Sequence, residues 1–464
     1  MMRLDTRRKP SDLLPAIDRL FSLSATKILA LEKRWNVTWG APVFTVKGQY
    51  QTRGWTEWTQ GFQFGSALLQ FDATGDRQFL ELGRSRTVER MAPHLTHTGV
   101  HDHGFNNVST YGTLWRLARE GRVEASDWEK SFYELALKIS GDVQSRRWTR
   151  LADGGFIHSF NGAHSLFVDT IRTLRSLALA HHLAHRAFEE QDAAVDLLGR
   201  LVQHARATAR YSVYYGERRD DYDVRGRVAH ESLFNPANGS YRGPSTQQGY
   251  SPFSTWTRGL AWAMLGFAEQ LEFITTVVAP DALAPFGGHA ATVEWMTAAA
   301  RATADFYIES AAAADGIPYW DTGAPGLSAL PGWRDTPADP FNEHEPVDSS
   351  AAAIAAQGLL RLGRVLAARK EDGARYEQAG LQVLAELLDE NGPYLSVESR
   401  HEGLLLHSVY HRPGGWDYKP EGSCVPHNES SQWGDYHLRE AALYVRRLAA
   451  GGPYLTFFAG QHGD

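Results

Sequence analysis

The sequence predicts an all-α protein, most simply one closed toroid of helices. Roughly a dozen segments have helical spacing of apolar residues. Clear β-alternation is scarce, and no break in composition marks a domain boundary. The helices alternate with long loops, which in a toroid gather at one end. A stacked helical solenoid would give the same periodicity, so periodicity alone leaves these two arrangements open.

In the first half of the chain, helical spacing predicts helices over 11–31, 65–71, 78–91, 111–120, 126–139 and 193–215. The residues Phe167, Ile171, Leu174 and Ala178 share one further helical face. Glycine-containing loops are expected over 93–104 and 151–164. A turn is expected over 72–76.

In the second half, helices are expected from 259, over 290–314, from Asp348, over 377–390 and over 438–450. Short strands are expected at 395–397 and 404–410. The polar segment 217–250 contains several turn signals and is expected to be a long loop. A long loop within a compact domain usually has a function.

Composition narrows the class of protein. The 464 residues can bury a large core, and a hydrophobic fraction of 43% with a charged fraction of 22% is ordinary for a globular protein. A net charge of −7 gives no reason to expect nucleic acid as a partner. The single Cys424 excludes an internal disulfide and a multi-cysteine zinc site. We find no signal peptide and no run approaching the length of a membrane span, and therefore expect a cytoplasmic protein.

The stretch 248–262, QGYSPFSTWTRGLAW, has the densest group of aromatic and polar residues. Turn-forming residues precede Trp256 and an amphipathic run follows, which predicts a loop feeding a helix with Ser254 or Thr255 as N-cap. A helix N-terminus attracts anions, and arginine can grip a carboxylate with two hydrogen bonds. With flat Trp faces beside Arg258, this stretch favours a pocket for an acidic sugar. Alternatively, both tryptophans belong to the core and Arg258 caps a surface.

Two aspartates are candidates for acid–base chemistry. Asp102 lies on a loop between His101 and His103, and Asp169 lies at a helix start in apolar company. Apolar surroundings and a second carboxylate raise the pKa of a carboxyl group, so we expect Asp169 to be able to act as a general acid. Paired carboxylates are also typical of glycosidases. Alternatively, Asp169 only stabilises a helix dipole, or the histidines around Asp102 hold a metal ion.

The chain resembles the unsaturated glucuronyl hydrolases of glycoside hydrolase family 88. The motifs that carry the resemblance, in order, are WTQGF at 58–62, TGD at 74–76, HDHGF at 101–105, GFIH at 155–158, FVD at 167–169, WTRGLAW at 256–262, DSSAAAIAA at 348–356 and QWGDY at 432–436. The resemblance implies a single domain over 1–464, folded as a six-hairpin (α/α)6 barrel with the active site in the loops at one end.

The resemblance also implies a reaction. Its members release a 4,5-unsaturated uronic acid, left by polysaccharide lyases at the non-reducing end, by hydrating the C4=C5 double bond. Asp169 would protonate C4 and then help to activate water, and Asp102 would tune Asp169. The substrate contacts implied are Trp58, His101, His230, Gln248, Trp256, Arg258 and Trp262. No cofactor and no metal is implied, and the partner is an oligosaccharide carrying an unsaturated uronic acid. The contact between Arg258 and the substrate carboxylate is an electrostatic inference, and this arginine could instead order the tryptophans.

The chain departs from the family pattern in three places. His103 is bulkier than expected beside Asp102. Arg172 and Arg175 make the helix after Asp169 unusually basic and could pair with Asp102 or with substrate. The segment 422–433 is long, so no site residue is assigned there. The alternatives are a rhamnogalacturonyl hydrolase, another α/α-barrel sugar enzyme such as an epimerase or conventional glycosidase, and a barrel that only binds oligosaccharide. The source polysaccharide and the oligomeric state stay open.

Overall fold

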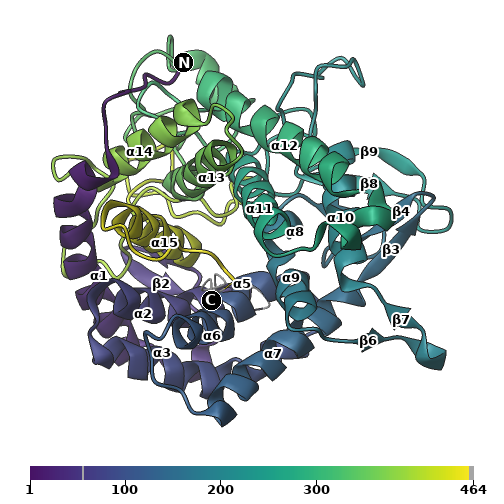
Figure 1. Ribbon diagram of the computed structural model, residues 1–464. Coiled ribbons are helices and arrows are strands. Elements are labelled where there is room, and N and C mark those ends of the chain that lie inside the picture. The colour runs from purple at the N-terminus through teal and green to yellow at the C-terminus, as the bar shows by residue number, and fades with distance from the viewer. Residues whose placement is uncertain (55–56, 459–464) are drawn as a thin grey trace.

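The computed structural model describes residues 1–54 and 57–458 and shows two concentric rings of helices (Figure 1). The inner ring is formed by α2, the continuous run α5–η4–α6, the pair α8–α9, and then α11, α13 and α15. Each of these contacts the next, and α15 returns to α2 and closes the ring. The expected closed toroid is therefore confirmed, and the solenoid is excluded.

The inner helices are followed or preceded in the chain by outer helices that run back along them. The outer helices are α1 (Leu14–Arg34), α3 (Arg77–Arg90), α7 (Asp127–Ser145), α10 (Leu197–Ala207), α12 (His289–Phe306) and α14 (Ala374–Leu388). The inner elements are α2 (Gln60–Thr74), α5 (His103–Asn107), η4 (Val108–Gly112), α6 (Thr113–Arg119), α8 (Thr170–Thr173), α9 (Arg175–His182), α11 (Thr257–Thr276), α13 (Ser349–Ala368) and α15 (Gln432–Ala449). One short helix, α4 (Ala92–Leu95), precedes α5.

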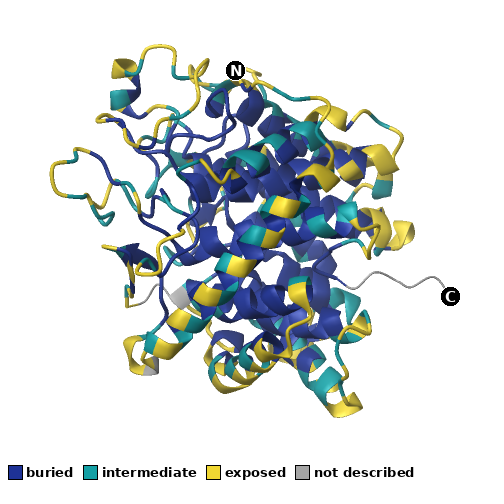
Figure 2. Cartoon of the chain, turned by 90° about the vertical axis from the view of Figure 1, so that its left-hand side faces the viewer, coloured by how far each residue is buried: buried dark blue, intermediate teal, exposed yellow. Residues whose placement is uncertain are grey.

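The inner and outer rings differ in how far their helices are buried. The inner helices are buried on nearly all sides, whereas the outer helices are amphipathic and expose one face to solvent (Figure 2). Helix α13 is long and apolar enough to cross a membrane, contrary to our expectation from the sequence. However, 83% of its most apolar segment of 18 residues is buried inside the fold, as is typical of a core helix.

Local signals fix several helix ends. Gly75 ends α2 with a φ of 75°, and the Asp76 side chain accepts a hydrogen bond from the Gln78 amide (3.0 Å) to begin α3, so the expected turn is present. Ser126 and Glu129 form a capping box at the start of α7. Asp348 caps α13 as expected.

Short antiparallel strands lie in the loops. They pair as β1–β2 (Phe44–Val46, Gln49–Gln51), β3–β4 (Trp148–Leu151, Gly154–Ile157), β6–β7 (Ala187–Phe188, Ala194–Val195), and β5–β8–β9 (Ser165–Phe167, Glu231–Phe234, Tyr241–Ser245). The polar segment 217–250 is therefore partly a hairpin, and the glycine loop 151–164 contains β4. The three-stranded sheet joins this segment to the strand that leads into Asp169.

Three of our expectations about elements are wrong. The face from Phe167 to Ala178 is not one helix, because Phe167 ends β5 and the helix breaks at Leu174. The helix expected from 193 begins only at Leu197. The segments 395–397 and 404–410 share a single bridge, Leu395 to Leu405, and form no strands. The Asp435 carboxylate accepts the amides of Leu404 and Leu405 and so removes them from a ladder.

Candidate active site

A cavity of about 340 Å³ opens at the end of the barrel where the inner helices begin. Asp102, Asp169 and Trp256 are the N-cap residues of α5, α8 and α11, respectively, and Trp58 lies in the 3-10 turn Glu57–Thr59 that directly precedes α2. Because helix N-termini carry partial positive charge, this end of the barrel favours an anionic ligand. The lining residues are Trp58, Val100, His101, Asp102, Phe105, Phe160, Phe167, Asp169, Gln247, Gln248, Trp256, Arg258, Trp262, Tyr410, His411 and Trp416.

Eight of our nine predicted site residues line this cavity, and the ninth, His230, lies directly behind its wall. The His230 ring packs on Phe167 and Trp256, with ring centroids 4.5 and 4.8 Å apart. Its Nδ1 accepts a hydrogen bond from the Gln247 amide at 3.0 Å, which leaves the ring proton on Nε2 when the ring is neutral. Burial lowers the pKa of His230 to about 4, so the ring is neutral near pH 7.

An acid–base centre lies on one wall. His101 Nε2 lies 3.1 Å from Asp169 Oδ1 and 3.8 Å from Asp102 Oδ1. The three residues are only 2%, 8% and 8% exposed. The imidazole thus sits between two carboxylates that reach it from different inner helices.

The pKa shifts in this centre differ from our expectation. Burial opposes protonation of His101, but the charge of Asp102 and the hydrogen bond to Asp169 raise its pKa overall. Burial raises the pKa of Asp102. Burial also acts to raise that of Asp169, yet the hydrogen bond and charge of His101 outweigh it, so the pKa of Asp169 is lowered. The expectation of a raised pKa for Asp169 is therefore wrong for the unliganded protein, because sequence reasoning did not place His101 against it.

Among the predicted site residues, two imidazole nitrogens are buried without a hydrogen-bond partner in the part of the chain that the structure describes. They are Nδ1 of His101 and Nε2 of His230. A buried polar group without a partner is costly, so such groups usually serve a ligand or hold a water molecule. Both rings flank Phe167, and both lie near Asp169. They are candidates to contact the hydroxyl groups of a bound sugar.

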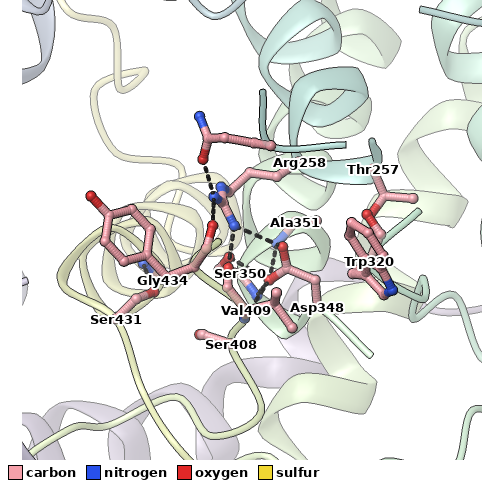
Figure 3. A network of polar contacts seen from close by, with 12 residues as sticks. Thr257, Arg258, Trp320, Asp348, Ser350, Ala351, Ser408, Val409, Ser431 and Gly434 are labelled. Carbon is pink, nitrogen blue, oxygen red and sulfur yellow. Dashed lines mark hydrogen bonds and ion pairs between the residues drawn. The ribbon is translucent and has the colours of Figure 1, made fainter. Parts of the chain in front are cut away.

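Arg258 is held by the protein on several sides (Figure 3). Its Nη1 donates to Asp348 (3.1 Å) and to the Val409 carbonyl, and its Nη2 donates to Gln248 Oε1 (2.8 Å) and to the Tyr410 carbonyl (2.7 Å). The guanidinium carbon also lies 4.5 Å from the Trp256 ring and 4.9 Å from the Trp433 ring. This geometry supports the reading in which Arg258 orders the tryptophans and the loop around Val409, rather than gripping a substrate carboxylate with both Nη atoms.

The N-cap of α11 is Trp256, and not Ser254 or Thr255 as expected. The Thr255 amide instead donates to Thr322 (3.1 Å), and the Thr257 amide donates to the Trp320 carbonyl (3.1 Å). These contacts to a loop distant in sequence take the place of a side-chain cap. They hold Trp256 at the cavity wall.

Aromatic rings form the other walls. Trp58 stacks on Trp433, with ring centroids 5.1 Å apart and an interplanar angle of 24°. Trp262 packs on Phe105 at 4.8 Å. Flat apolar surfaces of this kind suit the faces of sugar rings.

Sequence reasoning assigned no role to the other lining residues. Tyr410, His411 and Trp416 come from one C-terminal loop, which Asp417 folds back by accepting the amides of Tyr410 and His411. The aromatic run in that loop was the available signal, but only the fold brings it to the cavity that Asp169 also lines. The rings of His411 and Trp416 lie 4.3 Å apart, and both residues line the cavity.

The three departures from the family pattern lie away from the cavity lining. Arg172 pairs with Glu269 and Glu440, both at 2.8 Å, in the barrel interior. Arg175 lies 3.8 Å from Glu269 and donates to the Gly104 carbonyl. Neither arginine pairs with Asp102, contrary to one of our expectations, and His103 binds the His97 carbonyl (2.9 Å) instead of facing the cavity.

A helical barrel with a buried carboxylate pair and aromatic walls at one end defines a carbohydrate-active enzyme of the (α/α)6 type. A model of the Glycosyl Hydrolase Family 88 matches residues 38–281, more than half of the chain. The chain belongs to this family and is a glycoside hydrolase.

Known relatives share the whole barrel. The chain is 28% identical over 406 residues to the unsaturated glucuronyl hydrolase of Bacillus sp. (strain GL1), covering 85% of this chain and 88% of that protein. The crystal structure of the unsaturated glucuronyl hydrolase from Bacillus sp. GL1, described as responsible for the degradation of glycosaminoglycan, superposes with a TM-score of 0.69 at 24% identity, over 97% and 99% of the two chains. A further solved structure, a UGL variant with dGlcA-Glc-Rha-Glc, gives a TM-score of 0.69 at 23% identity, over 97% and 100%.

Proposed function

We propose that this enzyme releases a 4,5-unsaturated uronic acid from the non-reducing end of lyase-generated oligosaccharides by hydrating the C4=C5 double bond. The observation that carries the proposal is the His101–Asp102–Asp169 centre, buried beside an aromatic cavity at the N-termini of inner helices. Family membership and the relatives' names support the same reaction.

The proton for C4 starts in this centre. In the proposed mechanism His101, whose pKa is raised, carries this proton within hydrogen-bond distance of Asp169. A neighbouring anion raises the pKa of a carboxyl group. Binding of a uronate with its carboxylate nearer to Asp169 than to His101 therefore favours transfer of this proton to Asp169, which then protonates C4. The Asp169 carboxylate next takes a proton from the water that adds to C5. The resulting hemiketal opens and the glycosidic bond is lost.

The uronate carboxylate is attracted by fixed groups of the site. The N-termini of α5, α8 and α11 converge on the cavity, and neutral His230 presents an Nε2 proton near Asp169. Gln248 gives its Oε1 to Arg258 and thereby keeps its amide nitrogen as a donor. We assign sugar stacking to Trp58 and Trp262, and positioning of Trp256 to Arg258.

The test uses purified enzyme and a panel of lyase-generated disaccharides, with loss of the ultraviolet absorbance of the conjugated double bond as the signal. Wild type is expected to remove the absorbance. Asp169→Asn is expected to lower kcat by about 10² to 10⁴ and to keep substrate affinity within about tenfold, because general acid catalysis is lost while the pocket is kept. Asp221→Asn, at an exposed loop position, is the control and should match wild type.

Two results would contradict the proposal. Cleavage of saturated glycosides without loss of absorbance would indicate a conventional glycosidase. Binding without any turnover by wild type would indicate an oligosaccharide-binding barrel. Since burial raises the pKa of Asp102, Asp102→Asn belongs in the same series. If it abolishes turnover while Asp169→Asn retains it, Asp102 is the acid.

A further inference from the structure

Arg147 lies outside the cavity lining and holds two loops next to the acid–base centre. It follows α7 and is 8% exposed. Its guanidinium donates to three backbone carbonyls: Nε to His158 (3.0 Å), Nη2 to Ser159 (2.5 Å) and Nη1 to Thr98. One side chain thus joins two loops that are far apart in the sequence.

Both loops hold the catalytic imidazole. Thr98 lies three residues before His101, in the loop that also carries Asp102. Ser159 precedes Phe160, which lines the cavity and stacks on the His101 ring at 6.1 Å with an interplanar angle of 19°. A shift of either loop would therefore move His101 relative to Asp169.

The same end of α7 holds the loop at a second point. Gln144 Nε2 donates to the His101 carbonyl (2.9 Å) and to Thr173 Oγ1 (2.6 Å). The loop from Thr98 to His101 is thus fixed at both ends, by Gln144 within α7 and by Arg147, which follows this helix. Gln144 supplies no charge, whereas Arg147 does.

The charge of Arg147 acts on the centre. Within the described part of the chain, no carboxylate lies within ion-pair distance of its guanidinium. Burial lowers the pKa of Arg147, and Asp102 is the carboxylate that opposes this effect. In return, Arg147 acts to lower the pKa of Asp102 against the raising effects of burial and Asp169. The other charged or titratable groups that act on Asp102 are His101 and His97.

We propose that Arg147 is a positioning residue for this reaction, which holds the loop with His101 and Asp102 against the loop with Phe160 and places a buried positive charge against the backbone of the loop that carries Asp102. This assignment rests on the proposed function. It gives Arg147 two separable roles, one geometric and one electrostatic.

The experiment compares Arg147→Met and Arg147→Lys through kcat, KM and the pH dependence of kcat/KM. Arg147→Met is expected to lower kcat by about 10²-fold, because small misplacement of catalytic groups has effects of this size. It should also move the pH profile to higher pH, because loss of the positive charge raises the pKa values of Asp102 and His101. Arg147→Lys keeps the positive charge but loses the planar guanidinium that donates to three carbonyls. We therefore expect kcat to fall while the pH profile of kcat/KM stays in place.

Arg146→Met is the matched control, since this neighbouring arginine is half-exposed and makes its contacts at the surface, with Asp142 (3.0 Å) and the Phe188 carbonyl (3.1 Å). It should retain wild-type kcat and pH profile. The inference is overturned if both Arg147 variants have wild-type kcat, or if Arg147→Met loses activity with an unmoved profile. If Arg147→Met does not fold, Arg147→Lys decides: a lower kcat supports the inference and an unchanged kcat overturns it. Inactive wild type would instead refute the proposed function.

Discussion

At the scale of single residues, the chemistry depends on where one proton lies. His101 separates two buried carboxylates whose pKa values move in opposite directions, because Asp169 receives the hydrogen bond of the imidazole and Asp102 does not. The site therefore raises the proton affinity of His101 next to Asp169, the carboxylate proposed to use that proton.

This arrangement predicts a pH-dependent contribution of His101 to stability. The pKa of His101 is raised above 6.5, so its stabilisation is complete below pH 6.5 and is lost as the pH rises through the folded-state pKa. The pKa of Asp169 is lowered below 3.8, so the contribution of Asp169 to stability is complete above pH 3.8. This contribution is lost as the pH falls through the folded-state pKa of Asp169. The free energy of unfolding of wild type minus that of His101→Gln should thus be largest between these values, about 1.5–3 kcal/mol, and should shrink at higher pH. Urea unfolding across the pH range measures it, and a difference that grows above pH 6.5 would show that His101 is neutral.

At the scale of elements, the two carboxylate-bearing helices approach closely because one of them carries a glycine. A Cβ added at Gly104 in α5 would lie 2.4 Å from the carbonyl oxygen and 2.5 Å from the Cα of Thr173 in α8. Backbone-to-backbone contact is therefore needed to bring Asp102 and Asp169 to the same imidazole.

Gly104→Ala is accordingly expected to push α5 and α8 apart and to lower kcat by at least about 10²-fold. Overpacking of this kind typically costs about 1–3 kcal/mol, so the variant should still fold. Initial rates and thermal unfolding, with Gly452→Ala as a control whose added Cβ would meet only ordinary contacts at 3.6 Å, test this expectation. Wild-type kcat in Gly104→Ala would mean that the spacing of these helices is not critical.

At the scale of the whole molecule, charged residues tie the inner ring together. Arg172 comes from α8, Glu269 from α11 and Glu440 from α15, and all three are buried. These elements are far apart in the sequence, so the cluster forms only when the ring closes. Its polar groups take part in fixing how the inner helices meet.

Replacing Arg172 removes a positive charge that compensates the buried carboxylates of Glu269 and Glu440. Removal of one partner of a buried ion pair typically costs about 3–5 kcal/mol. Arg172→Met is therefore expected to lower the free energy of unfolding by about this amount in denaturant titrations. Arg206→Met, at an exposed position of α10, should have little effect. Equal stability of the two variants would show that apolar packing alone closes the ring.

The sequence by itself determined most of the helices and several of their ends, and it named the candidate site residues. Periodicity, the cap at Asp348 and the turn at Gly75 depend on neighbours in the chain, so local reasoning can reach them. The motifs of the family resemblance and the stretch 248–262 likewise named eight of the residues that line the cavity.

Only the tertiary structure decided which of these residues meet. His101 and Asp169 are 68 positions apart, and their hydrogen bond reverses the pKa shift expected for an isolated buried carboxyl group. Arg258 contacts Asp348 and the carbonyls of Val409 and Tyr410 only once the ring has closed. These hydrogen bonds give Arg258 a structural role in place of the substrate contact expected from the sequence. The residues that bury each site group and form hydrogen bonds with it come from segments distant in the chain. These residues set the charge state and the orientation of the group, so only the tertiary structure could decide them.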